Sequence, residues 1–236
     1  MTSTLAALLL AHAVADFLLQ TDAIVATKRR PGTLLLHTAI VLVTAQAALG
    51  RVDAWEPVAL AAAHIVIDTL KAYALPDRLW SFLADQALHL VTIIAVATFA
   101  PTLYAGGLWA DLAWLPGVMA LAAGLIIAAP AGGHAVAKLV APLEAATTQG
   151  LPNGGRLIGL LERGIIYLLI IVGQPAGIGF LIAAKSVLRF EATKEDQSAG
   201  EYVIIGTLAS FGWAMVAGWA TLALVGALPP VPGLPG

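Results

Sequence analysis

The stretch Ser3–Gln20, STLAALLLAHAVADFLLQ, decides the fold class. Its apolar run approaches the roughly 20 residues that a helix needs to cross a bilayer. The run nevertheless carries two ionisable side chains, His12 and Asp16. It is not preceded by a basic segment, so we interpret it as a retained membrane span and not as a cleaved signal peptide.

The composition of the 236-residue chain extends this interpretation. Hydrophobic residues make up 60% and charged residues only 11%, against about 25% charged in soluble domains. The mean hydropathy is +0.90. The net charge of −2 gives no sign of a nucleic-acid partner. Because the chain has no cysteine, disulfides and thiolate ligands are excluded, and His, Asp and Glu remain for any metal.

The hydropathy pattern predicts an all-α, polytopic transmembrane helical bundle of about seven spans, with six to eight as the range. Lys and Arg in the short loops place the first and third loops in the cytoplasm and the N-terminus outside. We expect Pro130–Gly133 to break the fifth apolar run, and residues 134–150 to form an interfacial helix, a re-entrant piece or a continuation. The expected spans are 3–20, 33–50, 57–74, 82–104, 112–130, 160–187 and 201–228.

An internal repeat supports a division of the chain into segments. Residues 11–18 (AHAVADFL) resemble residues 63–70 (AHIVIDTL), and each opens a helical hairpin. We therefore predict four segments. They are a four-span His/Asp-bearing domain at 1–104, a broken span with a connecting segment at 105–155, a C-terminal helical hairpin at 156–228 and a Pro-rich tail at 229–236.

Ionisable side chains recur in the predicted spans at a fixed spacing. Each pair is four residues apart, so its two members share one helix face. A further histidine, His37, lies in the second span. The pairs are His12 with Asp16, His64 with Asp68, and Asp85 with His89.

The order within the pairs predicts a common depth. Asp85 precedes His89, the reverse of the order in the first and third spans. Because the fourth span runs in the opposite direction to those spans, the reversed order is what a common depth requires. At about 1.5 Å per residue, His12 and His89 each lie roughly 12 Å from the cytoplasmic ends of their spans. We therefore expect the three carboxylates to form one layer and the imidazoles of His12, His64 and His89 another, in the cytoplasmic half of the bilayer.

Three interpretations of this layer remain open. Imidazole and carboxylate ligands from several helices suit a divalent transition metal such as Zn, Fe or Mn. Chains of His and Asp also suit a proton or cation relay, and each Asp could instead fix a neighbouring His by a structural hydrogen bond. We favour a metal site, with His12, His64 and His89 as first-choice ligands. The full set of candidate metal ligands is His12, His37, His64, His89, Asp16, Asp68 and Asp85.

Basic residues border the predicted layer. Lys71 follows Asp68 on the same helix face, where it could pair with Asp68 or Asp16, receive an anionic headgroup or extend to the interface. Lys28, Arg29 and Arg30 are interpreted as topology determinants. The candidate catalytic residues are Asp16, Asp68, Asp85 and Lys71.

The assembled motifs are His12-x-x-x-Asp16-Phe17-x-Leu19-Gln20, His37, His64-x-x-x-Asp68-x-x-Lys71 and Asp85-Gln86-x-x-His89. Together they resemble an uncharacterised family of bacterial inner-membrane proteins that carries a domain of unknown function. The resemblance covers about residues 1–100, and Gly155–Arg163, Ala183–Ser186 and Glu201–Thr207 are similar to segments of longer members. It implies a multi-pass protein of the bacterial inner membrane. More loosely, the His-x-x-x-Asp pairs are similar to those of membrane proteins described as metal-dependent hydrolases.

We therefore expect a metal-dependent membrane hydrolase. Its substrate would be an amphiphile reached from the membrane, such as a phospholipid or an isoprenoid phosphate, and its partners would be membrane lipids. A transporter or proton/cation-conducting protein is the alternative, and a non-catalytic membrane scaffold is the third possibility.

Overall fold

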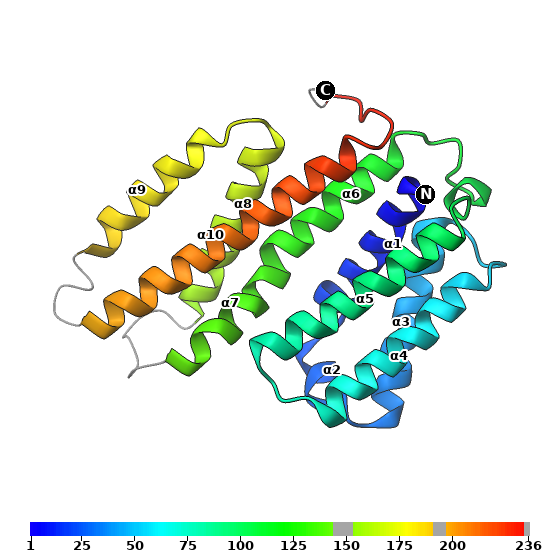
Figure 1. Cartoon of the computed structure of the whole chain (residues 1–236), viewed down its shortest axis with the longest axis horizontal. Coiled ribbons are helices and arrows are strands. Elements are labelled where there is room, and N and C mark those ends of the chain that lie inside the picture. Colours follow the sequence, from blue (N-terminus) through cyan, green and yellow to red (C-terminus); the bar gives the residue numbers. More distant parts are fainter. Residues whose placement is uncertain (144–152, 191–196, 234–236) are drawn as a thin grey trace. The chain divides into compact units, whose positions relative to one another are not determined.

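The computed structural model describes residues 1–143, 153–190 and 197–233, and of residues 187–190 and 197–199 it describes the backbone alone. Within these ranges the secondary structure is helical and contains no strand, which confirms the all-α prediction (Figure 1). Parts of the predicted segments 105–155 and 134–150 lie outside the described residues.

The helices have the following bounds. The N-terminal half holds α1 (Thr2–Val14), the π-helical turn η1 (Ala15–Leu19), α2 (Asp22–Thr27), α3 (Pro31–Leu49), α4 (Glu56–Ala74), α5 (Leu79–Phe99) and the short 3₁₀ turn η2 (Tyr104–Gly106). The rest of the chain holds α6 (Leu115–Ile126), the π-helical turn η3 (Ile127–Ala131), α7 (Gly132–Val140), the 3₁₀ turn η4 (Ala141–Leu143), α8 (Gly154–Ile171), α9 (Ala176–Phe190) and α10 (Gln197–Val225).

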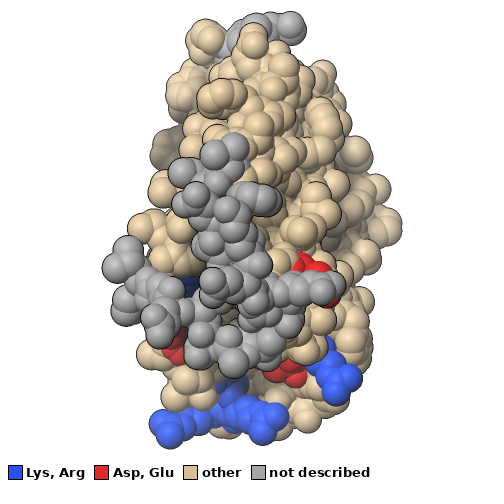
Figure 2. Space-filling view, turned by 90° about the vertical axis from the view of Figure 1, so that its left-hand side faces the viewer, with Lys and Arg blue, Asp and Glu red and all other residues tan. Residues whose placement is uncertain are grey.

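Six helical runs of the described chain are long and apolar enough to cross a membrane: Thr2–Leu19, Pro31–Leu49, Glu56–Ala74, Leu79–Phe99, Leu115–Leu143 and Gly200–Val225. The molecule is thus a polytopic helical bundle, at the lower end of the predicted range of spans. In Figure 2, residues other than Lys, Arg, Asp and Glu cover most of the visible described surface. Large apolar side chains such as Leu35, Val43, Val66 and Val91 are exposed along α3, α4 and α5. Such faces suit lipid and not water.

The described chain folds as two compact units, Met1–Ile126 with Ala223–Gly236, and Ile127–Leu222. The four-segment division predicted above stays a prediction.

In the first unit, α1, α3, α4 and α5 form a closed ring of neighbours. Helix α1 packs against α3 and α5, α3 packs against α4, and α4 packs against α5; α1 also packs against α6. Ala6 and Ala7 of α1 are fully buried, and such small residues allow close approach of helices in a membrane. Helix α1, whose His12 and η1 continuation carry the first motif, therefore has three helices as neighbours in this unit.

Local sequence signals fix the ends of α3. Pro31 stands in the first turn, where its missing N–H costs nothing. Gly50 follows the last turn with φ of 65°, and the Arg51 N–H donates to the Gln46 carbonyl, as in a Schellman C-cap. A Cβ on Gly50 would lie 2.8 Å from the Trp109 ring. Glycine is therefore required at this position both for its left-handed φ and for the close contact with Trp109.

In the second unit, the prediction of one span across 160–187 is wrong. Helix α8 ends at Ile171 and α9 begins at Ala176. Between them, Gly173 adopts a left-handed φ of 71°, and the Gln174 N–H donates to the Leu169 carbonyl. A left-handed glycine followed by proline is a helix stop, and the apolar flanks concealed it in the hydropathy profile.

The predicted break at Pro130–Gly133 is also wrong, because the fifth apolar run continues as helix through η3 into α7. Pro130 removes one N–H from the helical ladder, and the chain accommodates it as a π-helical turn. Two side chains of the same unit bond carbonyls in this turn: Trp213 Nε1 donates to Ile127 O and Arg163 Nε donates to Ala129 O, each at 2.8 Å.

Arg163 is expected to stabilise the second unit through this bond. It is 4% exposed, and its Nη1 also donates to Ser210 Oγ at 3.2 Å. Arg163→Met leaves the Ala129 carbonyl without this donor, which should cost about 2 kcal/mol and lower the thermal unfolding midpoint by roughly 4–8 °C. The measurement is thermal unfolding in detergent. Arg156→Met, at an exposed position of the same helix, is the matched control, and equal midpoints for the two variants would contradict the assignment.

Candidate metal centre

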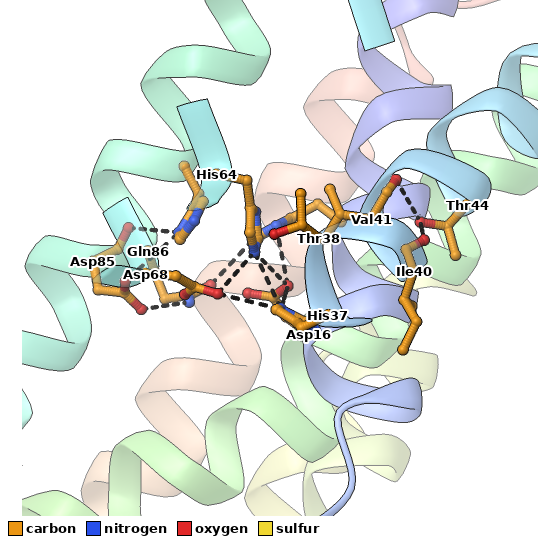
Figure 3. A network of polar contacts seen from close by, with 12 residues as sticks. Asp16, His37, Thr38, Ile40, Val41, Thr44, His64, Asp68, Asp85 and Gln86 are labelled. Atoms are coloured by element: carbon orange, nitrogen blue, oxygen red, sulfur yellow. Dashed lines mark hydrogen bonds and ion pairs between the residues drawn. The ribbon is translucent and has the colours of Figure 1, made fainter. Parts of the chain in front are cut away.

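Four buried side chains from three separate elements point toward one another within the first unit (Figure 3). η1 contributes Asp16, α3 contributes His37, and α4 contributes His64 and Asp68. Their exposed fractions are 7%, 0%, 3% and 2% respectively. The i, i+4 spacing of His64 and Asp68 puts both on one face of α4, as the sequence predicted.

The ligand-type atoms of these side chains are closely spaced. His37 Nε2 lies 3.1 Å from His64 Nε2. It lies 3.4 Å from Asp16 Oδ1 and 3.6 Å from Asp68 Oδ2. His64 Nε2 lies 3.6 Å from Asp16 Oδ1 and 3.4 Å from Asp68 Oδ2.

These separations match those of a tetrahedral metal site. At metal–ligand distances of about 2.0–2.2 Å, tetrahedral geometry places neighbouring ligand atoms about 3.3–3.6 Å apart. Five of the six pairwise separations among the four atoms, from 3.1 to 3.6 Å, fall in or next to that interval. The four side chains could therefore hold one ion with little movement.

The hydrogen bonding of the cluster also fits a cation. Asp16 Oδ1 and Asp68 Oδ2 are buried and have no hydrogen-bond partner among the described residues. These are the two carboxylate oxygens that face the imidazole nitrogens. Buried acceptors without donors are costly, and an ion between the four atoms would satisfy both carboxylates and both ring lone pairs at once.

The π-helical turn η1 shapes the first-span contribution. It begins at Ala15, directly before Asp16, and ends at Leu19. A π turn inserts an extra residue into the helix and is frequent at functional sites. It changes the angular offset from His12 to Asp16: the Asp16 carboxylate lies within 3.4–3.6 Å of His37 and His64, while His12 Nδ1 is 3.8 Å from Asp16 Oδ1.

Lys28 reaches the centre from the loop before α3. Its Nζ donates to Asp68 Oδ1 at 2.7 Å. Gln20, with its amide oriented to satisfy both ends, accepts from Lys28 Nζ at 2.7 Å and donates to the Asp16 carbonyl at 3.2 Å. The ammonium thus occupies one oxygen of Asp68 and leaves the other facing the two histidines.

A second set of polar side chains lies beside the first. Asp85 Oδ2 accepts from Gln86 Nε2 at 3.1 Å and lies 3.9 Å from Lys71 Nζ. Gln86 Oε1 lies 3.2 Å from His12 Nε2. The His89 ring lies with its centroid 4.1 Å from that of His64 and 5.2 Å from that of His12.

The buried side chains form three groups that could hold a metal ion: His12, Asp16 and His64; His37, His64 and Asp68; and Asp68, Asp85 and His89. All seven candidate ligands predicted from the sequence therefore come together in these groups. Their roles as ligands stay predictions.

The arrangement within the cluster differs from the expected one. His12 and His89, preferred as ligands with His64, each belong to a metal-capable group and also use one ring nitrogen elsewhere: His12 Nε2 lies 3.2 Å from Gln86 Oε1, and His89 Nδ1 lies 3.0 Å from the Asp85 backbone carbonyl. His37, considered a supplementary imidazole, stands at the centre. Lys71 Nζ lies 3.9 Å from Asp85 Oδ2, a neighbour that the sequence did not predict for it. Lys28 contacts Asp68, a role beyond the topology determinant that sequence reasoning assigned to it.

One comparison with known proteins matches the part of the chain that carries the clustered His and Asp side chains. Residues 4–109 match the model of a family described as "Protein of unknown function (DUF3307)". The chain matches no curated protein and no solved structure. The part that carries all the clustered His and Asp side chains is thus similar to a domain of unknown function.

Proposed function

We propose that the chain is a metal-dependent membrane enzyme that hydrolyses an amphiphilic substrate, a phospholipid or an isoprenoid phosphate. The observation that carries the proposal is the tetrahedral spacing of Asp16 Oδ1, His37 Nε2, His64 Nε2 and Asp68 Oδ2. Imidazole and carboxylate ligands favour Zn, Fe or Mn. When bound with a coordination position open to substrate or water, such an ion supplies Lewis-acid polarisation of a phosphoryl or acyl group and lowers the pKa of water.

The surrounding residues support an anionic, amphiphilic substrate. Lys71 and Lys28 place two ammonium groups at the carboxylates, and each side chain is partly exposed, at 18% and 17%. A small pocket adjoins the imidazoles of His12, His64 and His89 and is lined mainly by apolar side chains, including Leu8, Val41, Leu60 and Ile93. We assign the anionic headgroup to the lysines.

The resemblance of the motifs supports the bacterial inner membrane as the location, with membrane lipids as partners. A transporter would use the same ionisable layer without turnover. A scaffold would need the layer for stability alone.

Metal analysis of the untagged, detergent-purified protein tests the proposal. We expect at least one equivalent of Zn, Fe or Mn after preparation without chelator, and release of phosphate from long-chain alcohol phosphates in mixed micelles. His134→Gln, which removes the one histidine in none of the three groups, is the control. Ion flux in proteoliposomes without phosphate release would favour the transporter, and absence of bound metal would count against the enzyme.

Lys28 is expected to orient Asp68 toward the metal. Lys28→Met removes the 2.7 Å contact with Asp68 Oδ1, and loss of such an orienting partner weakens metal affinity by roughly 10- to 100-fold. Competition with a chromophoric chelator measures the change. Arg30→Met, an exposed neighbour in the same loop, should bind metal like the unaltered chain. Equal affinities for the two variants would remove Lys28 from the site.

A further inference from the structure

Asp68 belongs to two of the three metal-capable groups. With His37 and His64 it forms the group described above, and with Asp85 and His89 it forms another, whose ligand atoms lie within 4.8 Å of one another. In Figure 3, Asp68 lies between Asp85 on one side and Asp16 with His37 on the other. Asp85 is 8% exposed and His89 is 1% exposed, so both members of the second pair are withdrawn from water.

The proton positions leave this second group with free acceptors. His89 Nδ1 lies 3.0 Å from the Asp85 backbone carbonyl. Because a carbonyl can only accept, Nδ1 carries the proton and Nε2 carries the lone pair. That Nε2, and Oδ1 of Asp85, are buried and have no hydrogen-bond partner among the described residues. An imidazole lone pair and a carboxylate oxygen of this kind suit a divalent cation.

The two groups differ in the number of ligands they offer. Asp16 Oδ1 lies 3.4 Å from His37 Nε2 and 3.6 Å from His64 Nε2, so the first group supplies four protein atoms with it. Four protein ligands close a tetrahedral site, whereas catalytic metal sites keep a position open by using three. The second supplies three atoms, from Asp68, Asp85 and His89, and Lys71 Nζ stands 3.9 Å from Asp85 Oδ2. An open position beside an ammonium group is where an anionic oxygen of the substrate would be bound.

We propose that the chain holds a two-ion centre in which Asp68 is shared, with a closed first site (Asp16, His37, His64 and Asp68) and an open second site (Asp68, Asp85 and His89). The inference rests on the proposed function and deepens it by separating an ion that organises the bundle from an ion that faces the substrate. Adjacent ions sharing ligands are a recurrent arrangement in phosphoryl-transfer sites.

The two sites should differ in affinity. The first has two carboxylates facing its centre. The second ion binds next to the first ion and next to Lys71, so like-charge repulsion weakens it. We expect the dissociation constant of the second ion to exceed that of the first ion by roughly 10- to 1,000-fold, because a small difference in binding free energy changes a dissociation constant tenfold.

Equilibrium dialysis of the untagged, chelator-stripped full chain against buffered Zn²⁺ tests the two-ion centre. The unaltered chain should bind two ions in a tight step and a weaker step. Asp85→Asn and His89→Gln should each lose the weaker step and keep the tight one. His37→Gln should weaken the tight step, and His134→Gln should leave both steps unchanged.

The outcomes separate the two proposals. One ion per chain, with Asp85→Asn and His89→Gln binding it like the unaltered protein, overturns the second site and leaves the first intact. No bound ion overturns the proposed function as well. The stoichiometry of the unaltered chain decides the question even where a variant does not fold, and circular dichroism with gel filtration identifies such a variant.

Discussion

The His64→Gln variant is expected to lose tight metal binding and, with it, the sensitivity of its thermal unfolding to chelator. His64 belongs to two of the three metal-capable groups, and its Nε2 lies within 3.6 Å of Asp16, His37 and Asp68. At a free metal concentration about 1,000 times the dissociation constant, binding stabilises the native state by roughly 4 kcal/mol. For a chain of this size, that corresponds to a midpoint shift of roughly 8–16 °C.

The measurement compares unfolding midpoints in detergent with and without chelator. The unaltered protein and the His134→Gln control should each show the full shift, while His64→Gln should show none. A His64→Gln protein that still responds to chelator like the control would place the ion elsewhere, whatever its total metal content.

The gathering of the ionisable side chains could be predicted from spacing alone. A His and an Asp four residues apart share a helix face whatever the tertiary structure. The reversed order of Asp85 and His89 also follows from the direction of their helix. These arguments need only the helical repeat and the alternation of spans, both of which the apolar runs determine.

The central position of His37 could not be predicted in this way. No acidic residue stands four positions from His37, so no local pattern marks its face as functional. Its importance arises because α3 packs against both α1 and α4, which brings one imidazole between Asp16 and Asp68. Helix neighbours, and not helix periodicity, carry that information.

Lys28 and Arg163 were missed for a related reason. A lysine in a short loop is usually interpreted as a topology determinant. Only the three-dimensional path of the loop brings the Lys28 ammonium to Asp68. Arg163 is buried because the π-helical turn at Pro130 exposes a carbonyl to it, and hydropathy does not report such turns. The helix end at Gly173-Gln174-Pro175, by contrast, could have been predicted from the sequence, because glycine followed closely by proline is typical of a helix C-terminus. The long apolar run around it led to the prediction of a single span.

Asp68→Asn is expected to abolish metal binding at both proposed sites, because both use the Asp68 carboxylate. It should also destabilise the metal-free protein. The substitution removes the negative charge from the residue that Lys28 contacts at 2.7 Å. The Asp68 side chain is 3% exposed and the Lys28 side chain 17%, so the ammonium is left partly buried without its closest counter-charge. Breaking one partner of a fully buried pair costs about 3–5 kcal/mol, and partial exposure of Lys28 should reduce this to roughly 2 kcal/mol.

A double-mutant cycle separates the two effects. Adding Lys28→Met to Asp68→Asn removes the uncompensated ammonium, so the unfolding midpoint of the metal-free double variant should recover most of the loss. Metal content and phosphate release should not recover, because the shared carboxylate is still absent. Asp53→Asn, at a carboxylate that is 69% exposed and paired with Arg51, controls for the loss of one acidic group. If Lys28→Met also restored metal binding to Asp68→Asn, Asp68 would act as a counter-ion to Lys28 and not as a ligand, and the shared centre would have to be abandoned.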